Sequence, residues 1–127
     1  HRLPYNQEYC DAFCQHLPFT TISQHTLVTG EALTFYVPWC GLEAVPLAEK
    51  RIRWNELPIG NVIWGPLLGG MAIKYGPCTE VLWTMPIFRV PEQYLADLKK
   101  AGRAIWEATF NTKELIEVEY RIKGSQK

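Results

Sequence analysis

Lys74 is the side chain whose chemistry depends most on its surroundings. It lies between Ile73 and Tyr75, in a run that ends at Gly76-Pro77. A lysine removed from water holds its proton less tightly, and such an amine can form an imine with a ketone or bind a carboxylate. The competing interpretation is an ordinary surface lysine, so the place of Lys74 in the fold decides between them.

Three further residues could move protons or bind anions. Glu31 follows a turn at Gly30 and could act as a base, and His25 could donate to a carboxylate or act as an acid. Arg89 lies in an apolar run, where a partly buried arginine requires an anionic partner. The alternatives are a solvated turn residue for Glu31, a structural histidine for His25, and a nearby glutamate as the partner of Arg89.

Flat aromatic rings could form the wall of a binding pocket. Trp39, Trp64 and Trp83 lie in or near predicted loops and strand ends, whereas Trp106 is expected to pack on the sheet. An exposed indole would stack on a flat substrate, although such a tryptophan also serves as core. Trp64 is the preferred pocket wall.

Alternating apolar residues predict several short strands. The expected strands are Phe19–Gln24, Ala32–Val37, Asn61–Trp64, Met71–Tyr75, Ile87–Val90 and Ile116–Ile122. Gly30 marks a hairpin turn between the first two, and the glycine and proline residues from 65 to 70 favour antiparallel pairing of the next two. The segment Pro38–Arg53, with two prolines and many charges, is expected to be irregular.

Side-chain parity along these strands groups the candidates. The residues expected to point inward are Leu33, Phe35, Val37, Met71, Ile73 and Tyr75. Tyr36 and Lys74 then project together from the outer face. We therefore expect a groove that contains Tyr36 and Lys74, with Trp64 as its aromatic wall.

Two helices complete the prediction. The stripe of Tyr9, Cys10, Phe13, Cys14 and Leu17 predicts a helix near Glu8–Leu17, with Asn6 as its cap and Pro18 as its stop. Pro91 opens a second helix, Glu92–Ala101, which Lys99, Lys100 and Gly102 close. We expect a single domain, residues 1–127, as part of a longer chain.

Composition narrows the possible partners. The chain has 127 residues, of which 47% are hydrophobic, and its 13 basic and 13 acidic side chains cancel. This balance does not favour a nucleic-acid partner, and no apolar run is long enough to suggest a membrane span. Four cysteines without metal-ligand spacing predict no metal site, reduced thiols and a cytoplasmic protein.

Several short motifs together resemble one group of proteins. They are Leu17-Pro18-Phe19-Thr20, Thr29-Gly30-Glu31-Ala32, Gly60-Asn61-Val62-Ile63-Trp64, Ile73-Lys74-Tyr75-Gly76-Pro77 and Ala104-Ile105-Trp106-Glu107. The chain is similar to small cyclophilin-like proteins, and most similar to their opine-forming branch, the cucumopine and mikimopine synthases. The resemblance implies a mainly β fold with two helices, in which a small antiparallel barrel closes on itself.

The resemblance also implies a reaction. Such enzymes join L-histidine to 2-oxoglutarate in a Pictet–Spengler condensation, which needs no cofactor. It implies catalytic roles for Lys74, Glu31, Tyr36 and His25, and substrate binding by Arg89, Trp64 and Tyr75. The implied partners are an amino acid and a keto acid, and self-association is left open.

Two other classes of function fit the same sequence. The chain could be a small-molecule-binding barrel without catalysis, or a structural domain of a larger protein. A condensed product formed from histidine and 2-oxoglutarate would separate an enzyme from both.

Overall fold

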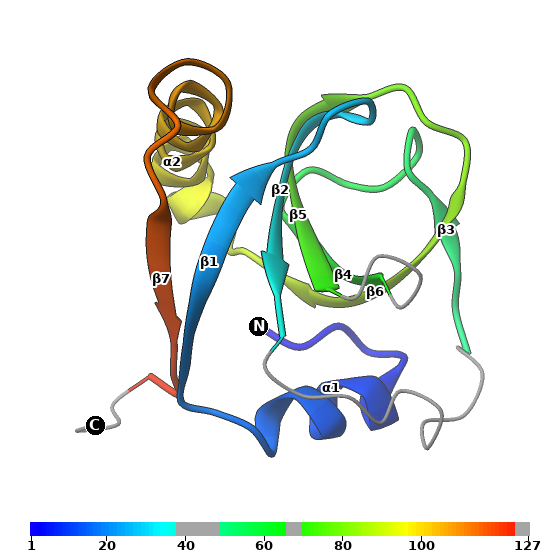
Figure 1. Ribbon diagram of the computed structural model, residues 1–127. Coiled ribbons are helices and arrows are strands. Elements are labelled where there is room, and N and C mark those ends of the chain that lie inside the picture. Colours follow the sequence, from blue (N-terminus) through cyan, green and yellow to red (C-terminus); the bar gives the residue numbers. More distant parts are fainter. Residues whose placement is uncertain (38–48, 66–69, 124–127) are drawn as a thin grey trace.

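The computed structural model describes residues 1–37, 49–65 and 70–123, which form one antiparallel sheet and two α-helices (Figure 1). Within these ranges the strands, in sheet order, are β3 (Ile52–Arg53), β6 (Trp83–Arg89), β4 (Asn61–Gly65), β5 (Gly70–Cys78), β2 (Gly30–Tyr36), β1 (Phe19–His25) and β7 (Ile116–Tyr120). The predicted mainly β class with two helices is confirmed.

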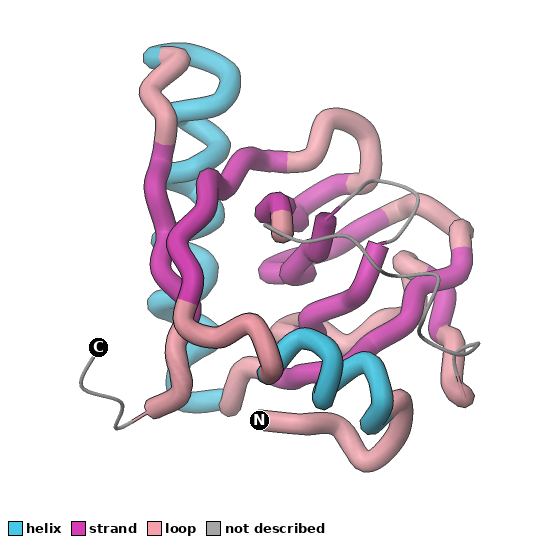
Figure 2. The backbone as a smooth tube through the Cα atoms, turned by 60° about the horizontal axis from the view of Figure 1, so that its bottom comes forward, coloured by secondary structure: helices cyan, strands magenta, loops and turns pink. Residues whose placement is uncertain are grey.

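The sheet is curled but open, so the described residues do not form the closed barrel that the resemblance implies. β3 and β7 are its two edges, and no ladder joins them in the described ranges. β1 pairs with β2 only from Ser23 to His25, whereas it pairs with β7 from Phe19 to Ser23. The β1–β7 pair therefore diverges from the rest of the sheet, as both backbone views show (Figures 1 and 2).

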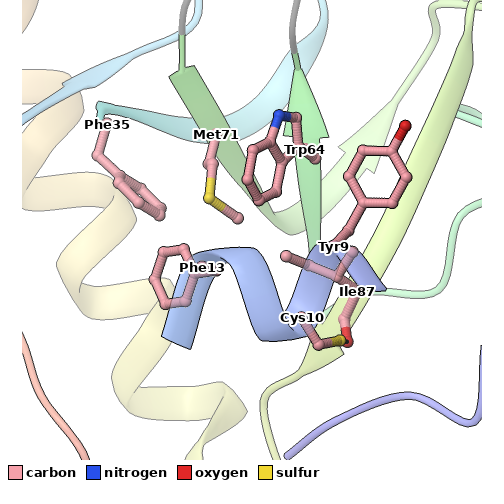
Figure 3. Close-up of a cluster of buried hydrophobic side chains, with 7 residues drawn as sticks. All are labelled: Tyr9, Cys10, Phe13, Phe35, Trp64, Met71 and Ile87. Atoms are coloured by element: carbon pink, nitrogen blue, oxygen red, sulfur yellow. Dashed lines mark hydrogen bonds between the residues drawn. The ribbon is translucent and has the colours of Figure 1, made fainter. Parts of the chain in front are cut away.

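One face of the sheet is covered by the two helices, α1 (Gln7–Cys14) and α2 (Leu95–Glu107). The β2–β5 register places Leu33 opposite Ile73 and Phe35 opposite Met71. Beneath α1, Figure 3 shows the cluster of Tyr9, Cys10, Phe13, Phe35, Trp64, Met71 and Ile87. Beneath α2, Tyr75 packs with Leu33 and Ile105. We call this side the helix face.

The opposite face carries Ala32, Ala72 and Lys74, which are also buried. Trp54 and Leu57, from the chain that follows β3, pack with the two alanines. The predicted parity is therefore correct in grouping the residues, but the outer face that was predicted to carry the groove is partly covered by Trp54 and Leu57.

α1 begins after Asn6 and ends at Cys14, three residues before the predicted Leu17. Asn6 occupies the cap position with φ 56°, but its side chain makes no capping bond to the helix. Its Nδ2 donates to the carbonyls of Lys50 (2.8 Å) and Pro86 (2.9 Å), and its Oδ1 accepts from the amide of Lys50 (3.0 Å). The buried amide therefore fastens the start of α1 to the edge of the sheet.

The second helix is longer than predicted. A 3-10 turn η3 (Glu92–Tyr94) leads into α2, and a π turn η4 (Ala108–Thr112) follows it. Gly102 lies inside α2 and does not end it. A Cβ there would lie 2.6 Å from three ring atoms of Tyr75, so glycine is needed for the close approach of helix and sheet.

The remaining strand predictions are mostly confirmed, with changed bounds. β6 begins four residues earlier than the predicted Ile87, and it accommodates Pro86 where the β4–β6 register shifts. In the predicted irregular segment Pro38–Arg53, residues 38–48 lie outside the described residues. Ile52 and Arg53 pair with β6, so that part of the prediction was wrong.

In the described ranges, the helices are too short or too polar to cross a membrane. Cys10, Cys14 and Cys78 are free thiols. Burial raises the pKa of the Cys10 thiol to about 11, and the thiol contacts the Ile87 carbonyl at 3.1 Å. Cys10 therefore serves as a small apolar residue of the core.

The approach of α2 to β5 generates the first prediction. Gly102→Ala should lower the free energy of unfolding by about 1–3 kcal/mol, because the added methyl group overlaps the buried Tyr75 ring. At an ordinary helix position the same change stabilises by about 1 kcal/mol, so the sign of the change in urea unfolding is diagnostic. The exposed Ala101→Gly is the matched helix control, and a Gly102→Ala protein of increased stability would contradict this packing.

Candidate functional site

The face opposite the helix face carries a cavity of about 420 Å³, which we call the sheet cavity. Thr34, Tyr36, Ile63 and Ala72 line it from the sheet, and Trp54 and Leu82 line it from the chain around β3 and β6. Two small residues of β5 lie in this wall. At Gly70 a Cβ would lie 2.5 Å from the Phe35 carbonyl oxygen, so glycine permits the close approach of β5 and β2, and Ala72 adds only a methyl group to the wall.

The surface of the sheet cavity is mostly apolar, and the polar residues in its lining are Gln24, His25, Thr26, Thr29, Thr34, Tyr36 and Glu80. The Tyr36 hydroxyl, on a half-exposed side chain, donates to Oε1 of Gln24 at 3.2 Å. Glu80 is an acidic residue of the lining, and its backbone carbonyl accepts from the amide of Asn55 at 2.9 Å. Among the lining residues that the structure describes, Glu80 is the acid and none is a lysine or arginine.

Two backbone contacts fix the position of Glu80. The bond from Asn55 joins it to the chain after β3, and the adjacent Thr79 amide donates to the Thr29 carbonyl at 3.0 Å, in the β1–β2 turn. Glu80 was missed in the sequence because it follows β5 in a short segment without periodicity. The only signal for Glu80 in the sequence was an acidic residue shortly after a long apolar strand.

His25 borders the sheet cavity, but its ring is engaged elsewhere. Its Nδ1 lies 2.8 Å from the Thr26 carbonyl oxygen, which can only accept, so Nδ1 carries the proton. In the tautomer assigned from these contacts, Nε2 accepts from the Tyr75 hydroxyl at 2.7 Å. The ring also lies 5.9 Å from that of Phe110, centroid to centroid.

Three of the predicted site residues, His25, Glu31 and Tyr75, lie together under α2 beside Arg103, and we call these four residues the α2 polar cluster. Burial raises the pKa of Tyr75, and the nearby guanidinium of Arg103 opposes this. Glu31 Oε1 lies 4.0 Å from Arg103 Nη1, and Glu31 and Tyr75 are not lining residues of the sheet cavity. The α2 polar cluster joins β1, β2, β5 and α2, so its side chains hold these elements together.

Lys74 shares a face with Tyr36 but does not line the sheet cavity. Only 4% of it is exposed, and its Nζ donates to the Trp54 carbonyl at 2.7 Å. Burial lowers its pKa, in the direction that the sequence suggested. The sheet cavity therefore contains Tyr36 but not Lys74, because the chain around Trp54 covers the lysine.

The predicted aromatic wall also lies elsewhere. Trp64 is buried on the helix face, where its ring meets Tyr9 edge-on at 5.3 Å. Trp54 and Ile63 line the sheet cavity in its place. Trp83 is exposed beneath the Arg53 guanidinium at 4.6 Å, and Trp39 lies outside the described residues. Arg89 is exposed at the end of β6 and lines a different cavity.

The buried amine of Lys74 generates a pH-dependent prediction. Its pKa is below the ordinary value of 10.5 in the folded protein, so the unfolded chain binds the proton more tightly. The stability of the wild type relative to Lys74→Met should therefore rise as the pH increases from neutral towards 10.5. Denaturant unfolding of both proteins between neutral pH and pH 10.5 measures this difference in stability. The exposed Lys99→Met is the control, and a wild-type advantage that falls with pH would refute the assignment.

Comparison with known proteins identifies one related structure. No family model and no curated protein sequence matches the chain. A solved structure of McbB in complex with tryptophan matches with a TM-score of 0.87 and 32% sequence identity. The match covers 96% of this chain and 39% of the McbB chain, so this chain spans about two fifths of the length of McbB. Over that length, the chain has a fold related to that of McbB.

Proposed function

We propose that this chain provides the amino-acid site of an enzyme that performs a Pictet–Spengler-type condensation. The observation that carries the proposal is the match to McbB, whose structure was solved with tryptophan, over 96% of this chain. The opine-synthase resemblance in the sequence points independently to an amino acid with a reactive ring. Both routes lead to the same class of substrate.

The sheet cavity suits such a substrate. Its volume of about 420 Å³ lies within the range of small-molecule sites. Trp54, Ile63 and Leu82 offer apolar surface to a flat ring, and Glu80 offers a carboxylate to an α-ammonium group. Tyr36 adds a hydroxyl at the exposed part of the wall.

The chemistry is redox-neutral. The ammonium group loses a proton, the amine attacks the carbonyl carbon, and water leaves, which gives a protonated imine. A ring carbon of the amino acid then bonds to the imine carbon while the C=N electron pair moves to nitrogen, and the same ring carbon loses its proton to a base. In this proposal Glu80 first binds the ammonium group and then accepts a proton, while the apolar wall holds the ring close to the imine.

The two lines of support favour different amino-acid substrates. The McbB match favours an indole, and the sequence resemblance favours L-histidine with 2-oxoglutarate. A dicarboxylate requires cations, and no described lining residue of the sheet cavity is a lysine or arginine. Because the McbB match covers 96% of this chain, we place tryptophan first and the histidine pair second.

Product analysis tests the proposal. The complete protein would be incubated with tryptophan or histidine, each with 2-oxoglutarate or acetaldehyde as the carbonyl compound. Mass spectrometry should find a product with the summed mass of both reactants less one water. Binding of an amino acid without any product would instead support the non-catalytic binding barrel, and no binding would support a structural domain.

A pair of glutamate variants tests the base. Glu80→Gln should lower kcat by about 100-fold or more, because the amide cannot accept the ring proton. Glu31→Gln should leave kcat close to the wild-type value, because Glu31 lies beside Arg103 and outside the sheet cavity. Steady-state kinetics measures both, with thermal unfolding as the check on folding. The reverse result would return the base to Glu31, as the sequence suggested.

A further inference from the structure

The helix face contains a second cavity, of about 320 Å³, which we call the arginine cavity. Phe13 and Leu17, around α1, form part of its lining. Phe35, Ile73 and Phe88 from the sheet and Tyr120 from β7 also line it. Its interior is therefore almost wholly apolar and largely aromatic.

The divergence of the sheet explains why this space exists. Before Ser23, β1 is not paired with β2 and runs beside β7, where Phe19 is paired with Tyr120. The Phe35 ring of β2 stacks on the Tyr120 ring at 4.3 Å and 26°, across the point of divergence. Strands β2, β4, β5, β6 and β7 supply part of the lining, and α1 and the segments that flank β1, β6 and β7 supply most of the rest.

Two arginines line the arginine cavity. Arg89 is the last residue of β6, and Arg121 directly follows β7. Arg121 Nε lies 3.6 Å from Glu119 Oε1, but both side chains are at least half exposed, so this ion pair contributes little. Arg89 forms no salt bridge with any residue in the described ranges, and no described lining residue is acidic.

We propose that the arginine cavity is a binding site for an aryl carboxylate. Planar guanidinium groups match a carboxylate in geometry as well as in charge, and the aromatic interior accepts a ring edge-on or stacked. A phosphate or sulfate would leave the apolar interior empty, so the ligand needs both a ring and an anionic head. Burial raises the pKa of the Tyr120 phenol, so it stays neutral and does not repel the anion.

This site is distinct from the sheet cavity. The two lie on opposite faces of the β2–β5 pair and share only Phe35 among their described lining residues. An occupant of the arginine cavity therefore cannot react with a substrate in the sheet cavity. The proposal does not depend on the condensation chemistry.

Calorimetry on the complete protein at low ionic strength tests the site, with phenylacetate as the probe. Phenylacetamide has the same shape without the charge, and it should bind more weakly. Arg89→Gln and Arg121→Gln should each weaken phenylacetate binding about fivefold, as expected for an exposed ion pair. Lys99→Gln, on α2, makes the same change of charge away from the cavity and should bind like the wild type.

Three results would overturn the proposal. They are equal binding of the acid and the amide, wild-type affinity in both arginine variants, and no binding of phenylacetate. Each would leave the proposed condensation untouched, because product formation from tryptophan is measured separately. Conversely, a protein that makes no product but binds phenylacetate through both arginines would support this site alone.

Discussion

The approach of α2 to β5 at Gly102 determines much of this structure. Because glycine has no side chain, the helix lies directly over the Tyr75 ring. The Tyr75 hydroxyl then reaches His25, and His25 holds the end of β1 through Thr26. The close approach at Gly102 therefore links α2, through Tyr75 and His25, to the β1–β2 turn. This turn forms part of the wall of the sheet cavity.

The periodic parts of the fold could be predicted from the sequence. The β1–β2 hairpin, the β4–β5 pair and both helices follow from alternation, helical stripes and turn residues. Gly102 was misread because a glycine after two lysines has the local appearance of a helix end. Its actual role depends on Tyr75, 27 positions earlier in the chain, which no local pattern reveals.

The candidate site was only partly predictable, for a related reason. Alternation correctly places Tyr36 and Lys74 on one face, but it cannot show which part of that face is covered. Trp54 covers Lys74, and it lies in a polar stretch that gave no strand signal. Trp64 was assigned to the wrong face, whereas Glu80 was missed because it belongs to no periodic element.

The attachment of α1 through Asn6 has a consequence for the order of folding. The Asn6 side chain bonds the backbone at Lys50 and at Pro86, which are 44 and 80 positions away. Such contacts close long loops, and closing a long loop costs conformational entropy. Native contacts offset this cost only after the chain between the two ends has folded. An eight-residue helix is marginal on its own. We therefore expect α1 to become stable only once β6 is in the sheet.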